Sequence, residues 1–138
     1  MIGKPEPPVP PVPPTPPDPP TPVDPSPFVG DGLRVLITYE TQDVGNLKPG
    51  HQAAIFGKQV RELLDQKCVM GPDGKTHEWR IWDKDVAVGD ESDIWKAAAK
   101  RDKKSIPWIA IGNGKSGFEG PLPDRVEDTI ALINKFGG

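Results

Sequence analysis

Cysteine is almost absent from this 138-residue chain, which carries Cys68 alone. A single cysteine excludes a disulfide within the chain and a redox pair of the Cys-x-x-Cys kind. Histidine is nearly as scarce, and neither His51 nor His77 has a second ligand at the spacing that metal sites use. We therefore expect neither a metal nor another cofactor.

Long apolar runs and one-sided charge are also missing. No stretch approaches the roughly 20 apolar residues that a membrane-spanning helix needs, and prolines stand where a secretory signal has its apolar region. The net charge is only −3, and both signs are interspersed outside the proline-rich segment, which leaves no basic footprint for nucleic acid or anionic lipid. We expect a soluble protein that binds neither nucleic acid nor membrane.

Proline is the residue in excess, and 14 of the 19 prolines lie between residues 5 and 27. This segment contains no aromatic residue and only three valines, so it cannot bury enough apolar surface to offset its ordering entropy. Because proline fixes φ near −65° and removes a backbone donor, we expect polyproline II conformation. The chain is predicted to have two parts, a proline-rich extended arm (1–30) and a globular domain (31–138).

The arm repeats the pattern Pro-Pro-x between residues 7 and 21. Three residues per turn leave two prolyl edges for docking, and at roughly 3.1 Å per residue the arm reaches on the order of 70 Å. The candidate partner-binding positions on it are Pro7, Pro10, Pro13, Pro16 and Pro19. Three interpretations stay open: a ligand for an SH3-type module, a stiff spacer or disordered tail, and an arm laid along a partner's surface.

The first half of the globular part predicts a strand, a helix and a second strand. Residues 33–39 form a β-branched, apolar run. Residues 49–67 show helical spacing of apolar residues, with Phe56 on the apolar side. After the turn signal at 71–74, residues 78–82 alternate polar and large apolar side chains. A helix crosses between the two strands, so we expect them to be parallel.

The second half predicts a helix, a hairpin and a final helix. A short helix over 94–99 precedes a proline-opened strand over 107–111. Gly112, Asn113 and Gly114 then turn the chain into a short strand around 117–119. The last helix opens at Pro123. The expected fold class is α/β, with the order β-α-β-α-β-β-α.

The proline-opened strand with its glycine hairpin resembles the cis-proline strand of thioredoxin-like domains, and Gly120 fits the same pattern. The resemblance covers residues 33–136 and implies a thioredoxin-like sandwich in which the peptide bond before Pro107 is cis. It further implies that Pro107 faces the loop 40–48 and helps to bind extended peptide. Pro107 and Trp108 are therefore candidate partner-binding residues.

The redox chemistry of that family is not expected here, because the loop 40–48 contains no thiol. Cys68 falls at the C-terminal end of the helix 49–67, where the helix dipole opposes a thiolate. We interpret Cys68 as structural. A thiol-redox enzyme or thiol-binding protein that uses Cys68 remains an alternative, as does a peptide-binding adaptor that uses a groove near Pro107.

Two further motifs have ordinary explanations, and the tryptophans add one candidate contact. Asp83 and Asp85 lack the glycine and glutamate spacing of a calcium loop, and the glycines at 112, 114 and 117 match a dinucleotide fingerprint only in letters, since a strand is expected after them. Among the four tryptophans, Trp79 is one residue out of phase with Trp82 and Trp108, which predicts that at least one tryptophan lies on the outer side of the sheet or near its rim. That residue is a candidate for a partner contact.

Together these observations predict a non-catalytic structural or interaction protein. Its thioredoxin-like domain would be tethered through the polyproline arm to protein partners in a larger assembly. By analogy with capsid-decorating proteins, which pair a small domain with an extended arm, a virion is the assembly that fits best, with capsid subunits as the partners.

Overall fold

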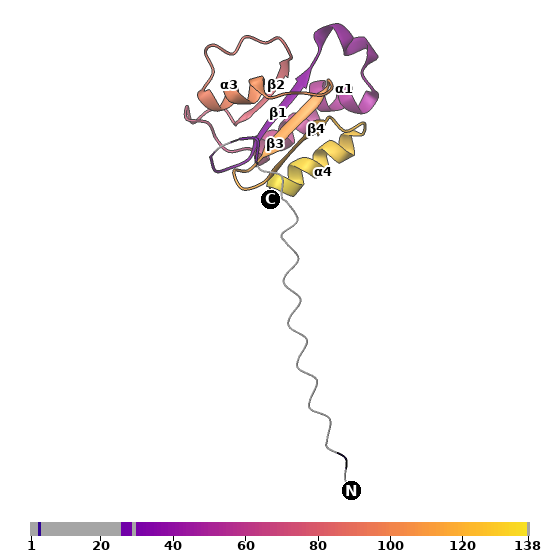
Figure 1. The fold of residues 1–138 in the computed structure, drawn as a ribbon. Coiled ribbons are helices and arrows are strands. Elements are labelled where there is room, and N and C mark those ends of the chain that lie inside the picture. The colour runs from indigo at the N-terminus through magenta and orange to yellow at the C-terminus, as the bar shows by residue number, and fades with distance from the viewer. Residues whose placement is uncertain (1–2, 4–25, 29, 138) are drawn as a thin grey trace.

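A computed structural model describes Gly3, residues 26–28 and residues 30–137 of the chain. The five candidate prolines of the arm, Pro7, Pro10, Pro13, Pro16 and Pro19, lie outside the described residues. The described part is a mixed α/β fold with the predicted order of strands and main helices (Figure 1). Its elements are β1 (Arg34–Tyr39), the 3-10 helix η1 (Thr41–Asn46), α1 (Pro49–Phe56), α2 (Lys58–Lys67), β2 (Trp79–Asp83), α3 (Asp93–Lys100), β3 (Trp108–Gly112), β4 (Gly117–Pro121) and α4 (Val126–Gly137).

The four strands form one mixed sheet in the order β2-β1-β3-β4. Strand β2 pairs with β1 in parallel, as the crossing helix predicts, while β1 with β3 and β3 with β4 are antiparallel. Ile37 marks the register, because it lies opposite Ile81 on one side and Ile109 on the other. The central strands β1 and β3 can therefore be buried on both faces of the sheet.

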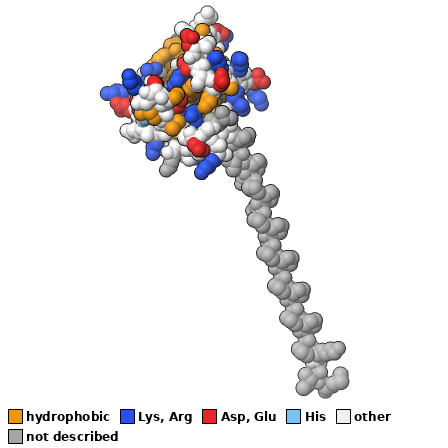
Figure 2. Space-filling view, turned by 90° about the vertical axis from the view of Figure 1, so that its left-hand side faces the viewer, with side chains coloured by type: hydrophobic (Ala, Val, Ile, Leu, Met, Phe, Trp, Pro, Cys, Tyr) orange, Lys and Arg blue, Asp and Glu red, His pale blue; other side chains and the backbone are white. Residues whose placement is uncertain are grey.

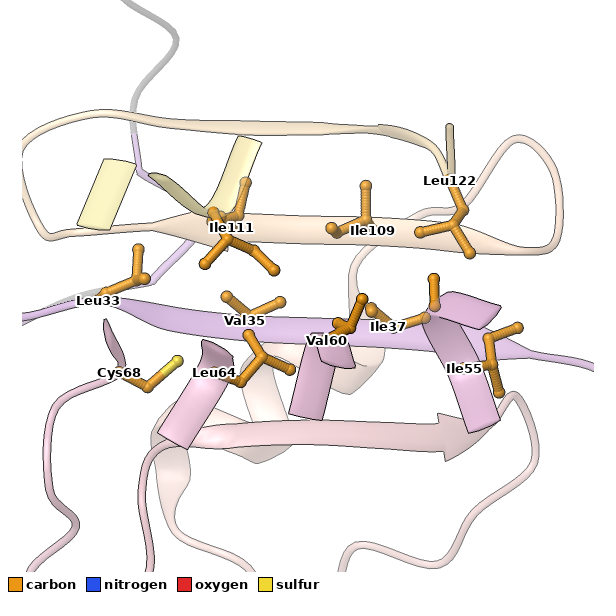
Figure 3. Packing of buried hydrophobic residues seen from close by; sticks show 12 residues of the cluster. Leu33, Val35, Ile37, Ile55, Val60, Leu64, Cys68, Ile109, Ile111 and Leu122 are labelled. Carbon is orange, nitrogen blue, oxygen red and sulfur yellow. The ribbon is translucent and has the colours of Figure 1, made fainter. Parts of the chain in front are cut away.

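The larger core lies between the sheet and the helices α1, α2 and α4. Alternate residues of β1 and β3 point into it and meet apolar side chains of the helices (Figure 3). The labelled core residues of the two strands are Val35, Ile37, Ile109 and Ile111, and all four are fully buried. The period of two along each strand thus supplies one continuous apolar face.

The smaller core lies on the opposite face, under α3. Trp95 of α3 packs edge-on against Phe28, with ring centroids 5.3 Å apart, and Phe28 is only 2% exposed. Leu36, Ala98 and Ala110 complete the buried cluster. Phe28, which lies within the segment 1–30 assigned to the arm, therefore packs with the globular part.

The prediction of a single helix over residues 49–67 is wrong in one respect, because the helix is broken in two at Gly57. This glycine has extended backbone angles, φ −76° and ψ 155°, and its N–H donates to the carbonyl oxygen of Ala53 at 2.9 Å. A Cβ at position 57 would stand 2.2 Å from that oxygen. Phe56, the last residue of α1 before the break, was expected on the apolar side but is 48% exposed and packs edge-on against Tyr39.

Surface charge is mixed on the face that Figure 2 shows, where Lys, Arg, Asp and Glu side chains are scattered among hydrophobic ones. None of the helices that the structure describes is long and apolar enough to cross a membrane.

Candidate interaction site

Pro107 lies immediately before β3, and the Ile106–Pro107 peptide bond is cis, as predicted. The Pro107 carbonyl oxygen accepts a hydrogen bond of 3.0 Å from the Leu122 N–H, which joins the start of β3 to the end of β4. Pro107 is half-buried. Trp108 is only 7% exposed, and its indole N–H has no hydrogen-bond partner among the described residues. Of these two candidate residues, Pro107 therefore offers more surface to a partner.

The start of α1 packs against the segment that follows β4. His51, which is buried, places its Nε2 atom 3.0 Å from the carbonyl oxygen of Leu122, so that the imidazole N–H can donate to it. The same nitrogen is 3.4 Å from Oδ1 of Asp124. A Cβ at Gly50 would stand 2.0 Å from the Asp124 carbonyl oxygen, so only glycine fits this close approach. Leu122 therefore links His51 to Pro107, because its carbonyl oxygen contacts His51 and its N–H donates to Pro107.

An exposed ion pair completes this region. Lys48 Nζ donates to Oδ2 of Asp124 at 2.8 Å. This hydrogen bond, with smaller contributions from the charge of Lys48 and from His51, lowers the pKa of the Asp124 carboxyl below its ordinary value. Sequence reasoning missed the group, although a Lys-Pro-Gly-His helix start and a Pro-Asp pair after the last strand were visible in the chain.

The sole thiol lies at the other end of the sheet from Pro107. Cys68 ends α2 and bridges Leu33 before the start of β1, whereas Trp108 pairs with Thr38 near the end of β1. In Figure 3 the same separation appears between Cys68 and Leu122. Burial, followed by the charges of Asp65 and Glu78, raises the pKa of the Cys68 thiol to about 12. The thiol is therefore protonated at neutral pH and remote from Pro107.

The loop expected to face Pro107 contains the 3-10 helix η1, and it is fixed by charged side chains. Oδ2 of Asp83 accepts from the Thr41 N–H at 2.8 Å and from the Thr41 hydroxyl at 2.6 Å, while its Oδ1 accepts from the Asp85 N–H at 2.8 Å. These hydrogen bonds lower the pKa of the Asp83 carboxyl. Within residues 26–28 and 30–137, no three His, Cys, Asp or Glu side chains are grouped so that they could hold a metal ion.

The root of the arm, defined here as Ser26, Pro27 and Phe28, is seated on the β3–β4 hairpin. The Ser26 hydroxyl donates to the Phe28 carbonyl oxygen at 2.8 Å and accepts from the Gly114 N–H at 3.3 Å. A Cβ at Gly112 would stand 2.1 Å from the Ser26 hydroxyl oxygen, and one at Gly117 would stand 2.6 Å from Cδ of Pro27. The glycines predicted to be hairpin residues therefore also let the arm root cross the sheet at close range.

A buried charged cluster, also missed from the sequence, joins β2 to α3. Trp95 Nε1 donates to Oε2 of Glu78 at 2.6 Å, and Glu78 is only 6% exposed. The Arg80 guanidinium lies 4.7 Å from the centre of the Trp95 ring, and its Nη2 atom is 3.4 Å from Oε2 of Glu91. These residues line a cavity of about 180 Å³. Since each charged group has a partner of the chain itself, we assign the cluster a structural role.

The tryptophans divide between the two faces of the sheet. Trp95 and Trp108 are buried, whereas Trp79 and Trp82 on the edge strand β2 are partly exposed. Trp79 packs toward the larger core and its Nε1 donates to Oδ1 of Asp65 at 2.8 Å, while Trp82 packs toward the smaller core. The rim position expected for at least one tryptophan is thus found on β2.

Comparison with known proteins gives the chain no relatives: no family model, no curated protein and no solved structure matches it.

Proposed function

We propose that this chain is a non-catalytic interaction protein whose domain is tethered through its proline arm to a larger assembly. The observation that carries the proposal is the seating of the arm root. Ser26 and Pro27 cross the β3–β4 hairpin over two glycines, and Phe28 fills the smaller core. A loose tail needs no such anchor, whereas a tether transmits force or position only if its end is fixed to the domain it holds.

The domain is best interpreted as thioredoxin-like. The order of its elements supports this interpretation, as does the sheet order β2-β1-β3-β4, in which β1 and β2 are parallel and the other two strand pairs are antiparallel. The proposal takes from it the position of a peptide-binding surface beside Pro107, and no chemistry.

A thiol-redox function is disfavoured by the environment of Cys68. A catalytic cysteine needs a thiolate near neutral pH and access to substrate. Cys68 is 4% exposed, and burial raises its pKa to about 12. We expect the protein not to reduce insulin disulfides with dithiothreitol as the electron source. Turnover that disappears in Cys68→Ser would establish the redox alternative.

A peptide-binding adaptor that uses the groove near Pro107 is the second alternative. The region offers the half-buried Pro107 and the exposed pair of Lys48 and Asp124. The Pro107 carbonyl oxygen, however, already accepts from Leu122. A peptide would have to find other backbone partners, so this region supports a binding function less strongly than the arm root does.

The assembly that we propose is a virus particle, with capsid subunits as the partners. The combination of a small domain with a long arm supports this choice. The test is sedimentation of an extract of the source through a density gradient, with the chain followed by mass spectrometry. The full chain is expected to sediment with a large particle, and a version that begins at Ser26 is expected to remain at the top.

A third version separates contact from spacing. It keeps the length of the arm but replaces the prolines between residues 5 and 25 with glycine and serine. If the prolines make contacts, this version also stays at the top of the gradient. If it sediments with the particle, the arm is only a spacer, and if the full chain itself stays at the top, the assembly proposal is wrong.

A further inference from the structure

We propose that the proline arm of one copy of this chain binds a groove between β4 and α4 of a neighbouring copy. The inference rests on the proposed function, because it names a binding surface for the tethering arm. It differs from the proposed function because it needs no other protein: two copies of this chain are sufficient.

The groove lies where the free edge of the sheet meets α4. Its volume is about 430 Å³, which falls within the range of roughly 300–1,000 Å³ typical of ligand pockets. Phe118 of β4 and Leu132 of α4 line it and are partly buried, and Ala131 lines it from an exposed position. Pro123, Asp128 and Lys135 complete the lining. The surface is thus an apolar strip with one aromatic ring and charges of both signs around it.

The arm has the chemistry that such a strip binds. A Pro-Pro-x repeat in polyproline II conformation presents prolyl edges without backbone donors, and grooves lined by aromatic and apolar side chains bind this conformation. The entropic cost is small, because proline restricts the free arm already. The segment between residues 5 and 25 contains 13 of the chain's 19 prolines and no lysine or arginine.

The place where the arm leaves the domain favours a neighbour's groove over its own. Ser26 and Pro27 cross Gly112 and Gly117 on the face of the sheet that holds Phe28 and α3. Phe118, in contrast, packs on the face that α4 covers. To enter its own groove, the arm would have to turn around the edge of β4, and a proline-rich segment resists sharp turns. A reach on the order of 70 Å makes a neighbouring copy accessible without that turn.

The resulting contact is head-to-tail. The arm and the groove are different surfaces of the chain, so each copy donates one and accepts the other. Such contacts close into rings or continue as chains of copies, and either arrangement would place many domains on one assembly. An arm that binds its own groove would instead leave the protein monomeric.

Sedimentation velocity of the purified full chain is the first measurement. We expect association that increases with protein concentration. Ala131→Glu places a charge in the apolar strip at an exposed helical position, and it is expected to weaken association on the order of tenfold. Asn134→Glu on the exposed side of the same helix does not line the groove and is the matched control. If Ala131→Glu associates as strongly as the wild type, the groove assignment is wrong.

A paramagnetic label on the arm then identifies the occupant. The first sample mixes two full-length proteins. One carries a nitroxide at Thr15→Cys, and the other has no nitroxide and is enriched in ¹⁵N. Broadening of the amide signals of Phe118, Ala131 and Leu132 in the ¹⁵N copy supports exchange between copies. A second sample carries the nitroxide and ¹⁵N in the same chain, at a concentration at which the protein is monomeric. Broadening in this second sample alone overturns the inference, as does the absence of broadening in both samples.

The two proposals can fail separately. If the arm tethers the chain to another protein, the full chain sediments with a particle while the purified chain remains monomeric, and only the groove inference is overturned. If the purified chain associates through the groove but no particle contains it, the assembly proposal is the one that is wrong.

Discussion

The two faces of the sheet are stabilised in different ways. The face covered by α1, α2 and α4 is an apolar core of twelve buried residues. Among the described residues, the face covered by α3 buries five such residues. It adds a buried glutamate, an arginine over a tryptophan ring and the arm root. One face therefore depends on packing volume and the other on specific polar contacts. The second is also the face to which the proposed tether is attached.

Truncation of one core residue on each face would show the difference most strongly. Ile111→Ala in the larger core is expected to cost about 4 kcal/mol, because three helices hold the surrounding side chains in place and the cavity cannot collapse. Leu36→Ala in the smaller core is expected to cost about 2.5 kcal/mol, since a single helix can move inward. Urea unfolding measures both values. Equal losses would contradict the proposed difference in rigidity.

Removal of one indole N–H would test the polar face. Trp95→Phe keeps most of the ring but leaves buried Glu78 without its donor at 2.6 Å, which we expect to cost about 2 kcal/mol. Trp79→Phe is the matched control, because its hydrogen bond to Asp65 is exposed to water and is expected to contribute little. Thermal or urea unfolding compares the two. A larger loss for Trp79→Phe would show that the buried cluster is not what holds α3.

Displacement of the arm root is expected to have a smaller effect. Gly112→Ala directs a methyl group at Ser26 and Pro27, and the atoms nearest to it belong to these two side chains. We expect a loss of about 1 kcal/mol and faster hydrogen exchange at the Phe28 and Gly114 amides, which donate to the Ser26 hydroxyl. Gly45→Ala, where no atom lies within 4 Å, is the control. Unchanged exchange would mean that the root is not held by this contact.

The pH dependence of the larger face is expected to be the smallest effect. The pKa of Asp124 is lowered in the folded state, chiefly by Lys48, so this pair stabilises the protein above the ordinary carboxyl pKa and ceases to do so as the pH falls through the lowered value. Lys48→Gln should raise the pKa of Asp124, as measured by NMR titration, and should remove this part of the pH dependence. Because Asp124 is exposed, a large change in stability would be unexpected.

Much of the fold followed from local patterns in the sequence. The β-branched runs predicted β1 and β3, the helix between the first two strands predicted their parallel pairing, and the end of the helical period placed Cys68 at a helix terminus. These features depend on neighbours in the sequence. The break at Gly57 did not follow, because glycine is compatible with a helical pattern and only the approach of the Ala53 carbonyl oxygen excludes a side chain there.

The candidate site was less predictable because it depends on long-range contacts. Ser26 and Gly114 are 88 residues apart, and a single serine at the end of a proline-rich segment gives no local sign of the hairpin that it contacts. Glu78 lies between His77 and Trp79, directly before β2, and a carboxylate is usually solvated. The hydrogen bond that Trp95 donates makes its burial tolerable. His51 and Asp124 likewise come together only when α1 packs against the end of β4.

The alkylation rate of the buried thiol of Cys68 measures how often the larger core opens. Cys68 reacts with an alkylating reagent only when the larger core exposes it, because folding removes it from solvent and keeps it protonated. When reclosing is faster than alkylation, the labelling rate is proportional to the equilibrium population of the open state. A single native cysteine thus allows every variant of either face to be ranked in native buffer, without a reporter being added and without extrapolation from denaturant.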